Sequence, residues 1–212
     1  MLKQKMIDRL HYTLVGNILE GYRIAKAYRR WLSRGGQTTI PFFLKPSVIK
    51  TFAQKYAIRV FVETGTYLGD MVEAVCSDFD KIYSTELSED LFNRAANRFA
   101  GNDHITILHG DSVQVMPEIL NHINIPCLFW LNGHYSSGNT AKEKKEASIL
   151  GELGLICMNP IKNHVVLIDD AHLFTGKNDI PSLDCLKTFI KNRFSDYEFD
   201  ILNNIIRIYK TL

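Results

Sequence analysis

Apolar residues follow two different spacings along most of this chain. Short runs rich in β-branched and aromatic residues recur between stretches whose apolar residues lie three or four positions apart. The clearest example is 58–75, where Ile-Arg-Val-Phe-Val leads into a polar turn and then into Leu68, Met71, Val72 and Val75. This pattern predicts a buried strand, a tight turn and an amphipathic helix.

The same alternation continues downstream. Strands that alternate with helices build parallel sheets, whereas two strands joined by a short polar turn pair in antiparallel. The last two predicted strands, 197–201 and 205–209, flank Asn203-Asn204 and therefore form a hairpin. We predict an α/β, Rossmann-like fold: a mostly parallel seven-stranded sheet with helices on both faces and a C-terminal antiparallel strand pair. The further parallel strands are predicted at 81–86, 104–109, 126–131 and 164–168.

The N-terminal segment differs from the rest in charge. Residues 5–32 have apolar groups at helical spacing, and residues 1–50 hold ten Lys and Arg against two acids, whereas the remainder has an excess of six acids. We expect a basic amphipathic helix within an appended segment, 1–45, before the main domain, 46–212. Three roles are open for this helix: covering the sheet edge or the pocket, contacting another subunit, or lying on an anionic membrane surface.

Cysteine spacing and hydrophobicity indicate the cellular compartment of the protein. The four cysteines are widely spaced without metal-ligand pairing, which favours buried, reduced thiols. No apolar run approaches the roughly 20 residues of a membrane span, and the N-terminus lacks the continuous apolar core of a secretion signal. These features predict a cytoplasmic protein.

The first predicted turn has unusual chemistry for a nucleotide site. Glu63 ends the strand, and Gly65 and Gly69 follow it. A dinucleotide site needs Gly-x-Gly-x-x-Gly to bring backbone amides to a pyrophosphate, and a carboxylate here would repel that group. The turn therefore disfavours an NAD-linked oxidoreductase and suits a ligand with cationic or hydroxyl groups.

Later strand ends strengthen this interpretation. Glu86 follows Gly65 by 21 residues, close to the spacing at which an acid binds ribose hydroxyls in such folds. Asp111 can cap the next helix or accept a hydrogen bond from an adenine amino group. Because ligands bind outside the carboxyl ends of strands in open α/β sheets, we expect these residues to face one ligand, together with Asn132 and Asp169.

Three separated motifs resemble those of class I S-adenosylmethionine-dependent methyltransferases, over roughly residues 46–210. They are the Glu-Thr-Gly-Thr-x-x-Gly turn at 63–69, Phe-Trp-Leu-Asn-Gly-His-Tyr-Ser at 129–136 and Ile-Asp-Asp-Ala at 168–171. The resemblance implies the methyltransferase fold and S-adenosyl-L-methionine as cofactor. It implies that the methionine part contacts Glu63, Gly65, Thr66 and Gly69, and that the ribose contacts Glu86. It also implies that the adenine contacts Asp111 and Ser112, and that Leu87 and Asn132 border the cofactor as well.

A neutral hydroxyl acceptor must also lose its proton during methyl transfer. His134 has the right intrinsic pKa range for this base, and Asp169 is a second catalytic candidate. Catechol-type relatives instead bind a metal through an Asp after strand four and an Asp-Asn pair after strand five. Asn132, Asp169 and Asp170 take the matching positions and would suit Mg²⁺, but Asn132 replaces the usual Asp and removes one negative charge from the metal site.

Two hypotheses of function follow from these residues. The first is methyl transfer from S-adenosyl-L-methionine to an oxygen of a small-molecule or sugar-like acceptor. The second is a catalytically degenerate cofactor-binding protein with an interaction role, because Asn132 weakens the acceptor site. No basic and aromatic stripe lies near the predicted cleft, which argues against nucleic acid as a partner. A homo-oligomer formed through the N-terminal helix is a further expectation.

Overall fold

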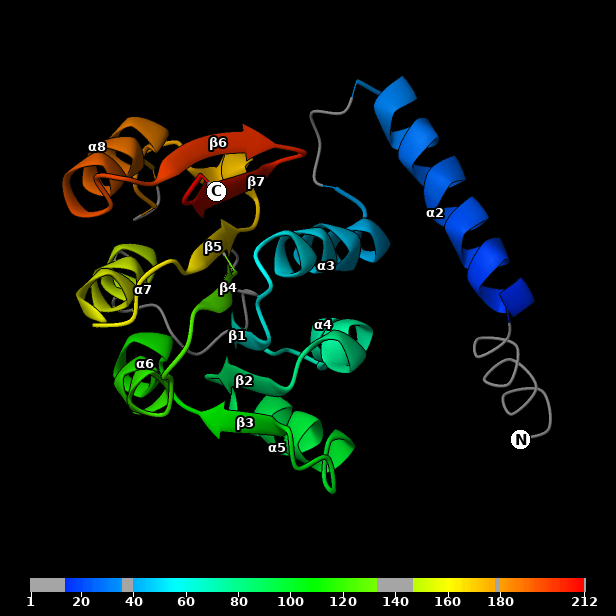
Figure 1. Ribbon diagram of the computed structural model, residues 1–212, viewed down its shortest axis with the longest axis horizontal. Helices are drawn as coiled ribbons and strands as arrows, with labels where there is room; N and C mark the ends of the chain where they lie inside the picture. Colours follow the sequence, from blue (N-terminus) through cyan, green and yellow to red (C-terminus); the bar gives the residue numbers. More distant parts are fainter. Residues whose placement is uncertain (1–13, 36–39, 133–146, 178–179, 212) are drawn as a thin grey trace.

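The computed structural model describes residues 14–35, 40–132, 147–177 and 180–211, and a single seven-stranded sheet forms its centre (Figure 1). The strand order is β3-β2-β1-β4-β5-β7-β6. The first five strands pair in parallel, and β7 pairs in antiparallel with both β5 and β6. The predicted fold class is therefore confirmed, including the final hairpin. The strands are β1 Val60–Thr64, β2 Lys81–Glu86, β3 Ile105–His109, β4 Cys127–Leu131, β5 Val165–Ile168, β6 Glu198–Leu202 and β7 Ile205–Tyr209.

Helices cover both faces of this sheet (Figure 1). One layer contains α6, α7 and α8, and the opposite layer contains α3, α4 and α5. The described helices are α2 Leu14–Ser33, α3 Lys45–Lys55, α4 Asp70–Val75, α5 Glu89–Arg98, α6 Ser112–Asn121, α7 Ala147–Met158 and α8 Leu183–Arg193, with short 3-10 turns η1 Phe42–Leu44, η2 Cys76–Asp78 and η3 Ala171–Leu173.

Each layer of helices has its own hydrophobic core against the sheet. Side chains alternate between the two faces of a strand, so one central strand supplies both cores. In β1, Val60 and Val62 pack on the α6 and α7 side, whereas Phe61 packs on the α3 and α4 side. Every residue of β1, β4 and β5 is buried, which explains why these strands read as unbroken apolar runs.

The helix α2 stands to one side of the domain rather than over the sheet (Figure 1). Trp31, near its C-terminal end, is buried in the same cluster as Leu44, whereas Tyr22, Tyr28 and Leu32 are exposed. Within the described part of the chain, α2 therefore does not cover the sheet edge. The boundary at residue 45 between an appended segment and the domain stays a prediction.

Two further sequence predictions can be compared with the structure. The four cysteines are free thiols, but only Cys127 is buried and Cys185 is exposed, so the prediction of burial was wrong for Cys185. Among the helices described, none combines the length and the apolar content that a bilayer span requires.

Candidate functional site

Polar side chains at the ends of four neighbouring strands lie on one face of the sheet. The strands β2, β1, β4 and β5 are adjacent, and their ends are in register, because Thr64 pairs with both Thr85 and Leu131, and Leu131 pairs with Ile168. Strand alternation places these side chains on the face that α3 and α4 cover. The four are Glu86, Glu63, Asn132 and Asp169. Apolar residues earlier in the same strands, Ile82, Phe61, Trp130 and Leu167, lie on this face, and Ser84 lies between Ile82 and Glu86.

Glu63 is a buried acid held by hydroxyl groups. Its carboxyl accepts a hydrogen bond from the Ser84 hydroxyl at 2.6 Å, and the Thr66 hydroxyl lies 2.6 Å from the Ser84 oxygen. When Glu63 is ionised, Ser84 gives its one proton to the carboxylate, and Thr66 is then the donor to Ser84. Burial raises the pKa of Glu63 to about 8, with the Ser84 hydrogen bond acting against this rise and the nearby charge of Glu86 adding to it. The carboxyl can therefore gain or lose a proton near neutral pH.

Glu86 is held by backbone amides instead. The amide N–H of Tyr67 donates to one carboxylate oxygen at 2.7 Å, and the N–H of Ser88 donates to the other at 2.9 Å. A carboxylate offers about four acceptor positions, so two remain for a ligand hydroxyl pair. Leu87 lies beside it and is 39% exposed, so its side chain can border a ligand at this edge.

The turn after β1 brings backbone close to these acids. Gly65 and Gly69 have φ values of +84° and +81°, which favour glycine. A Cβ at Gly69 would lie 2.5 Å from the Phe99 ring, and a Cβ at Gly65 would lie 3.3 Å from the Asn132 amide nitrogen. The amides of Gly65 and Thr66 both donate to the Thr85 carbonyl, which ties the turn to β2. These contacts fix the turn and place Asn132 against it.

Asp111 and Ser112 begin helix α6 at the end of β3. The Asp111 carboxylate accepts from the amides of Val113 and Gln114, so its predicted capping role is confirmed. The Ser112 hydroxyl donates to one oxygen of Glu152 on α7. Glu152 is 2% exposed, and its other oxygen has no hydrogen-bond partner among the described residues.

Glu152 is a functional candidate that the sequence analysis missed. Burial raises its pKa to about 8, and the Ser112 hydrogen bond acts against this rise. The signal in the sequence was an acid inside the apolar stretch 149–158. Glu152 adds an ionisable carboxyl group beside the expected adenine end of the site.

The end of β5 carries a buried ion pair that was also missed. Lys45, the first residue of α3, bonds through its ammonium to a carboxylate oxygen of Asp169. Lys45 is 8% exposed and Asp169 is 4% exposed. Burial raises the pKa of Asp169, and the charge of Lys45 opposes that rise. The Asp169 amide donates to the Leu131 carbonyl at 3.0 Å, which holds the pair beside Asn132.

Asp170 is engaged elsewhere. Its backbone has φ +55°, and its carboxylate accepts from the Asn204 side chain at 3.2 Å. Asn204 lies in the turn between β6 and β7 and also bonds the amide and ring of His172. The local fold therefore directs Asp170 toward the C-terminal hairpin, whereas Asp169 is paired with Lys45.

This donor set does not fit the divalent metal that the catechol-type resemblance implies. Such an ion needs several oxygen ligands, preferably charged. Asn132 is neutral, Asp170 binds Asn204, and the remaining carboxylate, Asp169, already has an ammonium against it. Within the described part of the chain, no three His, Cys, Asp or Glu residues gather in a metal-binding arrangement. The predicted base, His134, lies outside the described residues.

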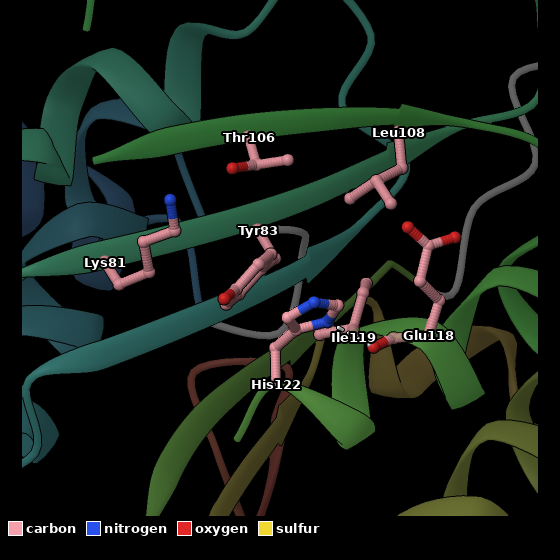
Figure 2. Close-up of a pocket in the computed structure, with 7 residues that line it drawn as sticks. All are labelled: Lys81, Tyr83, Thr106, Leu108, Glu118, Ile119 and His122. Atoms are coloured by element: carbon pink, nitrogen blue, oxygen red, sulfur yellow. Dashed lines mark hydrogen bonds between the residues drawn. The ribbon is translucent and has the colours of Figure 1, made fainter. Parts of the chain in front are cut away.

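A hollow on the other face of the sheet is a separate feature. It has a volume of about 270 Å³ and lies between β2, β3 and α6, as Figure 2 shows. Tyr83 and Leu108 face it and pack on the α6 side, opposite the face of Glu63 and Glu86. The hollow is therefore not part of the strand-end site.

No family model and no curated protein matches this sequence. Solved structures do match the fold. They include a protein proposed to be a caffeoyl-CoA O-methyltransferase from Staphylococcus aureus, with 14% identity, a TM-score of 0.59, and 92% of this chain and 100% of that chain covered. The O-methyltransferase TomG from Streptomyces achromogenes, in complex with SAM, has 12% identity, a TM-score of 0.57 and 89% of both chains covered.

An O-methyltransferase from Bacillus cereus, in complex with SAH, is similar to the same extent. It has 11% identity and a TM-score of 0.56, with 88% of this chain and 90% of that chain covered. At such identities the likeness concerns the fold alone. The chain has the Rossmann-like fold of S-adenosylmethionine-dependent methyltransferases, which confirms the predicted architecture.

Proposed function

We propose that this protein transfers a methyl group from S-adenosyl-L-methionine to an oxygen of a small-molecule or sugar-like acceptor. The observation that carries the proposal is the common face of Glu63 and Glu86 beside the glycine turn, within a methyltransferase fold. Two acids at adjacent strand ends suit a ligand that combines an ammonium, a sulfonium and ribose hydroxyls.

Each acid has a distinct proposed role. Glu86, whose oxygens retain acceptor positions beside Leu87, would bind the ribose hydroxyls. Glu63, Gly65, Thr66 and Gly69 would surround the methionine part, with the Glu63 carboxylate facing positive charge. Asp111 and Ser112 would border the adenine, although the Asp111 carboxylate is also the helix cap.

The reaction itself makes limited demands on the protein. The acceptor oxygen forms a bond to the methyl carbon, the sulfur–methyl bond breaks, and its electron pair stays on sulfur. The acceptor proton passes to a base, for which His134 and Asp169 are the candidates. Holding the oxygen in line with the sulfur–methyl bond can supply on the order of 7–11 kcal/mol.

Calorimetry with S-adenosylhomocysteine tests the cofactor site. Wild type should bind, and Glu86→Ala should weaken binding by about tenfold or more, because hydrogen bonds to charged groups contribute about 1.5–3 kcal/mol each. Asp90→Ala is the matched control: it removes an exposed acid four residues away and should leave affinity unchanged.

The Glu86 carboxylate also anchors the amides of Tyr67 and Ser88, so a thermal unfolding curve of each variant must accompany the titration. A folded Glu86→Ala variant with wild-type affinity would exclude the proposed ribose role. Absence of binding by wild type at millimolar ligand would exclude the cofactor.

Asn132 favours the second candidate function, a degenerate cofactor-binding protein. Its neutral side chain lies against Gly65 where relatives carry an acid. The discriminating experiment is an acceptor screen of wild type and Asn132→Asp. Turnover by wild type supports the enzyme, whereas an inert wild type with an active Asn132→Asp variant supports the degenerate protein.

We also propose that α2 contacts a second copy of the chain. Tyr22, Tyr28 and Leu32 are exposed apolar side chains of this helix, with Tyr28 and Leu32 one turn apart. The helix is basic, whereas residues 51–212 carry an excess of acids. Tyr28→Glu should lower the mass measured by light scattering at equal concentration. An unchanged monomeric mass for wild type would exclude the contact.

A further inference from the structure

Lys45 places an ammonium against Asp169, one of the residues that the catechol-type resemblance implies as a metal ligand. It enters from α3, outside the strand-end motifs, and its ammonium bonds to Asp169 at the end of β5. Asp169 and Asn132 each follow a paired residue, since Leu131 and Ile168 are partners across β4 and β5. The ammonium therefore lies at the end of β5, and the strand next to it, β4, ends at Asn132.

The position of Lys45 in its own helix is unfavourable without its partner. Lysine is the first residue of α3, where the positive end of the helix dipole favours acids. The side chain is also buried, 11% exposed, against an Asp169 side chain that is 6% exposed. Desolvating two charges can offset their attraction, so such a pair is weak grounds for a role in stability alone.

The neighbourhood of the pair has fewer acids for a divalent ion than the resemblance implies. Residue 132 is a neutral Asn where the resemblance implies an Asp, and the Asp170 carboxylate accepts a hydrogen bond from the neutral Asn204 side chain. One carboxylate, Asp169, remains beside one ammonium, Lys45. A divalent ion placed against Asp169 would meet the positive charge of Lys45, and the described residues gather no set of three His, Cys, Asp or Glu that could hold it.

We propose that Lys45 is a positioning residue that replaces the metal cation of this site, holding Asp169 and supplying the positive charge beside the acceptor end of the cleft. Asn132 and Lys45 then act in the same direction: the site has one acid fewer than the resemblance implies, and it has an internal cation. This inference rests on the proposed function for its role in methyl transfer, and it implies that the acceptor is oriented without a divalent ion.

Electron paramagnetic resonance of Mn²⁺ tests the replacement without an assay of activity. The full chain is titrated with Mn²⁺ alone, as wild type and as the double variant Lys45→Ala/Asn132→Asp. We expect no specific binding by wild type. The double variant frees Asp169 and restores the second acid, and should bind Mn²⁺ about tenfold or more tightly than wild type.

A matched control separates local geometry from net charge. Lys50→Ala/Asn132→Asp changes the net charge equally and alters a lysine of the same helix, which pairs with Asp78, but it leaves Lys45 in place. It should gain no Mn²⁺ affinity, and Lys45→Arg/Asn132→Asp should gain none because the positive charge is kept.

Several outcomes would overturn the inference. They are specific Mn²⁺ binding by wild type, no gain in a folded Lys45→Ala/Asn132→Asp variant, or an equal gain in the Lys50 control. Should the double variant not fold, Asn132→Asp alone decides: Mn²⁺ binding with Lys45 intact contradicts the replacement. Calorimetry with S-adenosylhomocysteine on the same samples reports the proposed function separately.

Discussion

The acids in the two halves of the strand-end face are stabilised by different kinds of group. The cofactor half, formed by Glu63 and Glu86 at the ends of β1 and β2, has two acids held by a hydroxyl and by backbone amides. The acceptor half, formed by Asn132 and Asp169 at the ends of β4 and β5 with Lys45, has one acid paired with one ammonium. Among the described residues, no cation pairs with the acids of the first half, whereas the second half contains such a cation.

This difference indicates what each half requires from a ligand. Burial and the charge of Glu86 both disfavour the ionised form of Glu63, so a cationic ligand relieves an existing cost in the cofactor half. In the acceptor half, the cation that stabilises the carboxylate of Asp169 is Lys45 of the chain itself. Loss of Lys45 should therefore strongly reduce the stability of the protein. In the cofactor half, ligand affinity should depend on pH.

The largest effect is expected from Lys45→Met, which breaks the ion pair of the acceptor half. It leaves Asp169 buried without its counter-charge, and should lower the free energy of unfolding by about 3–5 kcal/mol in urea denaturation. Lys50→Met removes a half-exposed pair on the same helix and should cost less than about 1 kcal/mol. If Lys45→Met and Lys50→Met lower the free energy of unfolding equally, burial of the Lys45–Asp169 pair does not determine the size of the loss.

Gly69→Ala should be next in size and probes the turn of the cofactor half. The variant combines an unfavourable φ of +81° with a Cβ 2.5 Å from the Phe99 ring. We expect a loss of about 2–4 kcal/mol in the free energy of unfolding. Gly101→Ala has a similar φ of +88° but open space around the Cβ, and should cost about 1–2 kcal/mol. If Gly69→Ala and Gly101→Ala lose the same free energy of unfolding, the contact with Phe99 does not contribute to the loss.

The affinity for S-adenosylhomocysteine should depend on pH through Glu63. Its pKa of about 8 means that the free protein holds a proton there at pH 6. The ligand ammonium favours the carboxylate, so binding releases this proton, and affinity should rise by up to about tenfold per pH unit before levelling above pH 8. Calorimetry in buffers of different protonation enthalpy measures the release.

Glu63→Gln should abolish this slope, and a wild-type affinity that stays constant with pH would exclude the proposed contact. Without ligand the linkage has the opposite consequence. The folded pKa lies above the ordinary 4.5, so the contribution of Glu63 to stability is complete below pH 4.5 and is lost as pH rises through about 8.

The smallest effect is expected at Asp111, the cap of α6. Asp111→Ala removes the acceptor for the amides of Val113 and Gln114 and should cost about 1 kcal/mol in the free energy of unfolding. Asp111→Asn keeps a capping oxygen and should restore most of that stability. If Asp111→Ala also weakens S-adenosylhomocysteine binding while Asp111→Asn does not, the residue serves both cap and ligand.

The sequence was sufficient for the fold and for the cofactor half because their signals are local. Strand, turn and helix follow one another within 58–75, and acids at strand ends must meet once the strands pair in parallel. The strand order alone was enough to predict that Glu63 and Glu86 lie on the same face of the sheet. The antiparallel hairpin was marked by Asn203-Asn204, both of which have positive φ.

The acceptor half could not be predicted in the same way. Lys45 and Asp169 are 124 residues apart, and Ser112 and Glu152 are 40 apart, so no local pattern relates either pair. Asp169 and Asp170 were adjacent in sequence and were predicted to act together. The left-handed backbone at Asp170 turns its carboxylate toward Asn204 instead, a consequence of tertiary packing.

A crystal structure of the protein with S-adenosylhomocysteine tests the central claim most directly. The account predicts a single molecule across the ends of β1 and β2, with ribose hydroxyls within about 3 Å of the Glu86 carboxylate and the ammonium near Glu63. A ligand in the hollow between β2, β3 and α6, or one that leaves Glu63 and Glu86 on separate surfaces, would contradict it.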